Sequence, residues 1–290
     1  MNNSNKYLYL YLSITFGVTW GIGILFLFFE DILIPMVGEL TLTHPIAILA
    51  LYSPTVAGLI TYYKFGGFKA IKGLLGKVIP RKKDLFWFPT LFVVVALLWV
   101  TIRSISPLFG MEVREVTYSL PEMIGTALWL FVEETGLIGG LFGWIGFLLP
   151  FFQAKFRNNI ISGILTGLLF GLWVLPGYLI SSFDLDQSYL LYVVLLMVFI
   201  SFMSYIFNAT NGNLLIYTFT FWLVASGSHI QLYFFNQPVQ LMQISFFAVC
   251  WLVTHFLFKK ITIDQTLKVF PDFIQSKKTK QKATPVTTEV

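Results

Sequence analysis

The chain has 290 residues, of which 57% are hydrophobic and only 11% are charged. A water-soluble domain of this composition would expose large apolar patches, so a soluble enzyme or carrier is excluded. The net charge of +5 is accounted for by basic loops beside a membrane and by attraction to anionic lipid heads. We therefore expect membrane lipids, and no nucleic acid, as partners of the charged segments.

Apolar runs of about 20 residues recur along the chain, which is the length that an α-helix needs to cross about 30 Å of hydrocarbon. This pattern predicts an all-α fold, a polytopic membrane helix bundle of about eight transmembrane helices. The predicted spans are residues 7–29, 44–63, 85–105, 121–150, 159–178, 188–208, 213–230 and 240–258.

The charges between the spans predict their orientation, because loops that stay in the cytoplasm are enriched in lysine and arginine. The segments 64–84 and 151–158 are basic, as is the tail after the last span. The segments 30–43, 106–120 and 179–187 carry mainly carboxylates. Both termini are therefore predicted to be cytoplasmic.

The first half of the chain also contains local packing signals. Pro54 and its small neighbours between Leu51 and Gly58 should let another helix approach the second span closely. Beyond this span, apolar residues recur at helical spacing between lysines over residues 65–79. They predict an amphipathic helix on the inner leaflet, or else a solvated linker. Arg103 closes the third span, where its long side chain can extend to water.

Three phrases stand out in the second half of the chain. Residues 143–150 read G-W-I-G-F-L-L-P, residues 170–176 read F-G-L-W-V-L-P, and residues 207–215 read F-N-A-T-N-G-N-L-L. They resemble phrases of the CPBP intramembrane metalloproteases, the CAAX-protease and bacteriocin-processing (Abi) family. In that family they read E-E-x-G-W-R-G-F-L-L-P, F-G-L-W-H-L-P and Y-N-x-T-G-G-S-L-L.

The resemblance implies an organisation and a location for the chain. Residues 119–260 would form a CAAX-protease-like core. Residues 1–118 would be N-terminal transmembrane helices that carry the amphipathic helix, and residues 261–290 a Lys-rich, partly disordered cytoplasmic tail. The protein would be integral to a bacterial plasma membrane.

The resemblance also implies where catalytic residues should lie. In the family, a metal ion or a glutamate activates water, and carboxylate, arginine and imidazole groups from three helices surround that water. Here those positions hold residues that can neither bind a metal nor transfer a proton. They are Gly140, Leu141, Ile145, Val174, Phe221 and Ala225. The substitutions predict a pseudoenzyme with no catalytic residues, no metal and no cofactor, in which the three helices converge on an apolar plug.

A second register of the first motif takes residues 133–139, E-E-T-G-L-I-G, as the family's E-E-x-x-x-R-G, with Ile138 in place of the arginine. We prefer the first register, because it keeps the long phrase that ends at Pro150 and a family-like distance to Phe170. The arginine is missing in both registers.

Glu133 and Glu134 lie within the fourth predicted span, where ionisable groups are costly and often functional. They are predicted either to be solvated near the outer interface or to form a retained polar site with His229, which should lie at a similar depth. His44 and His255 lie at the ends of their spans and are not expected to reach this site.

These patterns favour a catalytically inactive, CPBP-like membrane protein with a binding, regulatory or immunity-type role. Its partner would be another membrane protein or a hydrophobic peptide. The alternative is an atypical active intramembrane metalloendopeptidase that uses Glu133 and Glu134, with His229 and zinc. A small transporter is a third hypothesis, although the spans contain few polar residues and no persuasive internal repeat.

Overall fold

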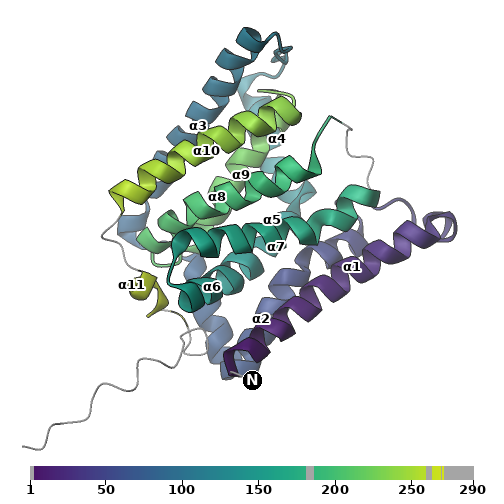
Figure 1. Cartoon of the computed structure of the whole chain (residues 1–290). Helices are drawn as coiled ribbons and strands as arrows, with labels where there is room; N and C mark the ends of the chain where they lie inside the picture. Colours follow the sequence, from purple (N-terminus) through teal and green to yellow (C-terminus); the bar gives the residue numbers. More distant parts are fainter. Residues whose placement is uncertain (1–2, 181–185, 259–262, 269, 271–290) are drawn as a thin grey trace, which may run out of the picture.

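A computed structural model describes residues 3–180, 186–258, 263–268 and 270. All regular secondary structure in this part of the chain is helical, which confirms the predicted all-α fold. In Figure 1, α5, α7 and α8 lie between α1 and α2 on one side and α3 and α10 on the other.

Each predicted span except the fourth overlaps a single α-helix, and α1 and α2 extend beyond the predicted bounds. They are α1 (Asn3–Val37), α2 (Pro45–Leu75), α3 (Trp87–Ile105), α4 (Leu120–Glu133), α5 (Thr135–Gly143), α6 (Leu149–Phe156), α7 (Asn159–Ile180), α8 (Tyr189–Ala209), α9 (Leu214–His229), α10 (Gln237–Leu257) and α11 (Ile263–Leu267). Shorter turns are η1 (Gly76–Val78), η2 (Lys82–Asp84), η3 (Ser106–Phe109) and the π-helical η4 (Trp144–Leu148).

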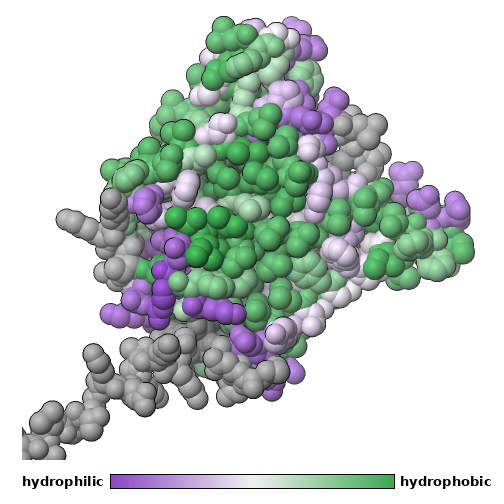
Figure 2. Space-filling model, viewed as in Figure 1, coloured by the Kyte–Doolittle hydropathy of each residue, from purple (hydrophilic) through white to green (hydrophobic). Residues whose placement is uncertain are grey.

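In the described part of the chain, 7 helices are long and apolar enough to cross a membrane. The predicted span that is not among these 7 is the seventh, residues 213–230. It corresponds to α9, which has 16 residues and is about 24 Å long at 1.5 Å per residue. The count of about eight therefore stays a prediction, whereas the multi-pass membrane character is clear. Figure 2 shows a broad hydrophobic surface along the helices, with hydrophilic residues beside α6 and at the far ends of α1 and α3.

Small residues let the central helices approach closely. Gly163 and Gly167 of α7 face α8, where an added Cβ would lie 2.5 Å from the Cα atoms of Ser201 and Met197 respectively. Packing through small residues one helical turn apart is the usual solution where lipid provides no hydrophobic driving force between helices. It fixes α7 against α8 at the centre of the bundle.

The fourth predicted span is not one continuous helix, which corrects the expectation for residues 121–150. Glu134 has non-helical dihedral angles (φ −102°, ψ 25°) and separates α4 from α5. The residues after Glu134 are rich in glycine, which has low helix propensity and favours a break at this point. A second irregularity lies before Pro150, which lacks an N–H group. The π-helical turn η4 precedes Pro150, and the helix continues beyond it to Phe156.

The predicted amphipathic segment 65–79 is largely the last part of α2, which a kink separates from the membrane-spanning part of that helix. A kink at Gly66 and Gly67 (φ +60°, ψ −153°) redirects the chain. Beyond the kink, Leu74 is buried while Phe68 is 77% exposed. One face of this helical segment is therefore buried against the bundle and the other is exposed.

We expect Gly67→Ala to lower the unfolding free energy by about 1–3 kcal/mol, because the backbone conformation of Gly67 is essentially restricted to glycine. Unfolding of the detergent-solubilised protein would measure it. Gly73→Ala is the matched control, since an added Cβ there meets nothing within 4 Å and alanine favours the helix by about 0.5–1 kcal/mol. Equal stabilities of the two variants would contradict the prediction.

The described part of the predicted tail is packed against the bundle. Asp264 of α11 forms an ion pair with Arg157, and Thr266 donates a hydrogen bond to the carbonyl oxygen of Asn208 (3.3 Å). Residues 271–290 lie outside the described residues. The expectation of partial disorder therefore concerns the part of the tail that the structure does not describe.

Candidate functional site

The three helices that carry the family-like phrases meet at a cluster of aromatic rings. Trp144 of η4 stacks on Phe170 of α7, with ring centroids 5.3 Å apart and an interplanar angle of 6°. Phe170 stacks in turn on Phe221 of α9, at 6.3 Å and 19°. We call Trp144, Phe170, Trp173, Phe199 and Phe221 the aromatic cluster; Trp173 and Phe199 contact its other rings.

The positions at which the resembled family would carry catalytic groups lie in or beside this cluster. Leu141 and Ile145 are buried, and Val174 and Phe221 are partly buried against the same core. A Cβ added at Gly140 would lie 2.7 Å from the carbonyl oxygen of Leu51. That spot has no room for a side chain without movement of α2. The side chains present there offer no proton donor, proton acceptor or metal ligand.

A polar network lies next to the aromatic cluster, and sequence reasoning missed it. The indole N–H of Trp173 donates to the hydroxyl of Thr19 (2.7 Å), and this hydroxyl also contacts that of Ser53 (2.8 Å). Three helices, α1, α2 and α7, are joined in this way. No pattern distinguishes these residues in the sequence, since threonine and serine are common in membrane helices.

Glu134 and His229 approach each other at the junction of α4, α5 and α9. Their side chains are 14% and 36% exposed, and Oε1 of Glu134 lies 3.6 Å from Nε2 of His229. The other ring nitrogen, Nδ1, lies 3.1 Å from the carbonyl oxygen of Ala225, so Nδ1 must be the donor of that bond. An attractive contact between Nε2 and the carboxyl group then requires a proton on one of the two.

The other polar candidates take no direct part in this contact. Glu133 is half-buried at the end of α4 and makes no hydrogen bond or ion pair with any described residue. His44 caps the start of α2, where Nδ1 accepts from Ile46 N (3.2 Å). His255 contacts the hydroxyl of Tyr205 (2.8 Å).

The donor set does not fit a catalytic zinc ion. Such a site uses three protein ligands and keeps a fourth position for water. The contact offers one carboxylate and one imidazole nitrogen. Among all residues that the structure describes, no group of three or more His, Cys, Asp or Glu side chains could hold a metal ion.

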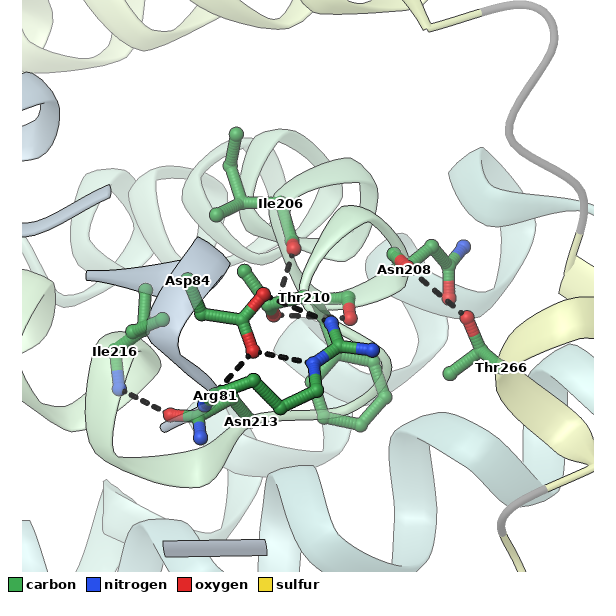
Figure 3. A network of polar contacts seen from close by, with 9 residues as sticks. Arg81, Asp84, Ile206, Asn208, Thr210, Asn213, Ile216 and Thr266 are labelled. Carbon is green, nitrogen blue, oxygen red and sulfur yellow. Dashed lines mark hydrogen bonds and ion pairs between the residues drawn. The ribbon is translucent and has the colours of Figure 1, made fainter. Parts of the chain in front are cut away.

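The third phrase forms the turn between α8 and α9 at the lysine-rich end of the bundle (Figure 3). The hydroxyl of Thr210 donates to the carbonyl oxygen of Ile206 (2.9 Å), and the side chain of Asn213 accepts from Ile216 N (2.9 Å). Beside the turn, Arg81 forms two hydrogen bonds, of 2.6 and 2.8 Å, with the buried carboxylate of Asp84. Here the phrase closes one helix and starts the next.

A double-mutant cycle on Glu134 and His229, made with Glu134→Gln and His229→Gln, is expected to give a favourable coupling energy of about 0.5–1 kcal/mol. This is the range for partly exposed ion pairs. Unfolding of the four proteins in detergent would measure it. Glu133→Gln with His229→Gln is the matched control, for which additive effects are expected. Additive effects in both cycles would show that the 3.6 Å contact contributes nothing.

The fold and the site together define an all-α, multi-pass membrane protein. No protein-family model matches the chain, and no curated protein matches it.

Proposed function

We propose that this protein is a catalytically inactive, CPBP-like membrane protein that acts as a binding, regulatory or immunity-type partner in the membrane. The observation that carries the proposal is the stack of Trp144, Phe170 and Phe221. It occupies the place at which, by the resemblance, a protease would bind and activate water.

The chemistry of the cluster supports the proposal. Peptide hydrolysis needs a base for water and a donor for the oxyanion, both near the scissile bond. Hydrocarbon side chains and glycine stand at every position from which the family would supply these groups. A single missing group can be replaced by a neighbour, whereas the loss extends over all three helices.

The partner that fits this protein is another membrane protein or a hydrophobic peptide. Helix α4 has a single buried side chain, that of Leu130, and is exposed over most of its other apolar residues. It is held by Trp222, whose ring stacks on Phe131 at 4.7 Å and whose N–H donates to the carbonyl oxygen of Ala127 (2.6 Å). A helix with so few internal contacts can present its free face to a partner.

Purified protein in detergent tests the proposal. We expect no stoichiometric zinc by elemental analysis, and cleavage of a fluorogenic peptide library no faster than in a detergent blank. Zinc content and peptide cleavage should be the same for Glu134→Gln, for the control Glu133→Gln and for the unaltered protein. Bound zinc together with cleavage that Glu134→Gln abolishes would overturn the proposal.

The second candidate function is an atypical intramembrane endopeptidase, and the contact between Glu134 and His229 favours it. A carboxylate and an imidazole that share a proton can act as general base and general acid. The same assay distinguishes the two functions. Under this candidate, Glu134→Gln and His229→Gln would each abolish cleavage and Glu133→Gln would not.

A further inference from the structure

A cleft lies at the end of the bundle opposite the lysine-rich turns, where the segment 110–119 folds back over α3, α9 and α10. Gln231 holds this segment, because its side-chain oxygen accepts from the backbone N–H and the hydroxyl of Thr117, both at 2.9 Å. The cleft is open to the outside, and its enclosed part has a volume of about 10 Å³. Arg103 and Arg114 both line it, together with Val113.

Each arginine is held in place by bonds from one nitrogen only. Nη1 of Arg103 donates to the carbonyl oxygens of Arg114 (3.1 Å) and Leu232 (3.0 Å). Nη1 of Arg114 donates to the carbonyl oxygen of Ser228 (2.6 Å), and its guanidinium group lies over the ring of Phe234 at 5.5 Å. A guanidinium group has five N–H donors. In both arginines the Nε and Nη2 donors have no acceptor among the described residues.

Neither arginine is neutralised by a carboxylate in the described structure. The two other arginines that it describes are both paired, Arg81 with Asp84 and Arg157 with Asp264. Glu112 also lines the cleft, yet its carboxylate forms no ion pair with either guanidinium group. The cleft is therefore lined by two positively charged guanidinium groups. Each is bonded to neutral backbone carbonyl groups, which do not neutralise its charge.

We propose that the opening of this cleft binds a phosphate oxyanion, and that its source is the headgroup of an anionic phospholipid. The edge formed by Nε and Nη2 is the part of arginine that pairs with phosphate oxygens in bidentate geometry. Helix α3 has 19 residues, or about 28 Å at 1.5 Å per residue, and leads from the lysine-rich η2 to Arg103. The cleft thus lies about one hydrocarbon thickness from η2, at the level of the opposite headgroup layer.

A purely structural role explains only part of this geometry. The Nη1 bonds fasten the segment 110–119 to the bundle, and a lysine could replace either arginine at one of these bonds. They do not explain why two arginines without a carboxylate partner line the same cleft, each bonded through Nη1 alone. The phosphate site accounts for both features.

Three probes test the proposal on the full chain in detergent, at constant ionic strength. They are dihexanoyl phosphatidylglycerol, dihexanoylglycerol without a phosphate, and inorganic phosphate, with binding followed by the melting temperature and by native mass spectrometry. We expect the phosphate-bearing lipid to bind and the phosphate-free lipid not to bind. Inorganic phosphate that binds as tightly as the lipid would overturn the lipid headgroup as the source of the phosphate.

The variants identify the groups that bind. Arg103→Lys and Arg114→Lys keep the positive charge but cannot form bidentate hydrogen bonds to phosphate. Each should therefore weaken phosphatidylglycerol binding at least about tenfold, the loss expected for a charged hydrogen bond. Glu115→Gln, on the same segment but outside the cleft, is the control and should leave the affinity within about twofold, as a surface change does. If a lysine variant fails to fold, Val113→Phe, which fills the cleft, must give the same loss. Equal binding of both lipids, or unchanged affinity in the folded variants, would overturn the proposal.

Discussion

Replacing Phe170 by alanine is expected to lower the unfolding free energy by about 3–5 kcal/mol, the cost of removing a large ring from a packed core. Phe170 is fully buried and its ring lies between those of Trp144 and Phe221. The substitution would remove both stacking contacts and leave a cavity where three helices meet. Thermal or chemical unfolding in detergent would measure the loss.

The matched control for this prediction is Leu172→Ala on the same helix. Leu172 is 37% exposed and faces away from the aromatic cluster, so we expect a change within about 0.5 kcal/mol. Phe170→Leu should fall between the two, because leucine keeps part of the buried volume. A stability of Phe170→Ala equal to that of Leu172→Ala would show that the cluster does not hold the helices together.

Gly143→Ala is expected to lower the unfolding free energy by about 3 kcal/mol, the upper part of the range for overpacked cores. A Cβ at Gly143 would lie 2.0 Å from the carbonyl oxygen of Pro54 and 2.1 Å from its carbonyl carbon. Both atoms belong to the backbone of α2, so no side-chain rotation can relieve the overlap. The two helices would have to separate, and the hydrogen bond from Gly143 N to the hydroxyl of Thr55 (3.2 Å) would lengthen.

Gly125→Ala is the control, because a Cβ at this position of α4 meets nothing within 4 Å. It should leave the stability unchanged or raise it slightly, since alanine has the higher helix propensity. If Gly143→Ala unfolds at the same temperature as Gly125→Ala, close contact between α2 and α5 is not required for the fold.

The close approach of α2 was predictable, and its partner was not. Pro54 and its small neighbours indicate that some helix packs tightly there. Only the structure identifies this helix as α5 and the contact as Pro54 against Gly143. Helices in a membrane have no apolar stripe that marks their inner faces, because lipid is as apolar as the core.

The residues of the candidate polar site were predictable from the sequence, but the contact between them was not. Glu133, Glu134 and His229 are conspicuous because charged groups are rare in apolar spans. The sequence cannot say which of two adjacent glutamates turns toward the histidine. The break in the helix at Glu134 decides this, and it directs Glu134, not Glu133, to His229.

The sequence by itself determined the all-α membrane class and the positions of most helices, because crossing the hydrocarbon imposes a minimum apolar length on each span. Only the tertiary structure decided which side chains meet: Trp144 with Phe170 and Phe221, and Arg103 with Arg114 around one cleft. The physical reason is that span length is a local property of the chain, whereas these contacts join residues on different helices. Their geometry depends on the kinks at Gly67 and Glu134 and on close glycine contacts, which set where each helix points.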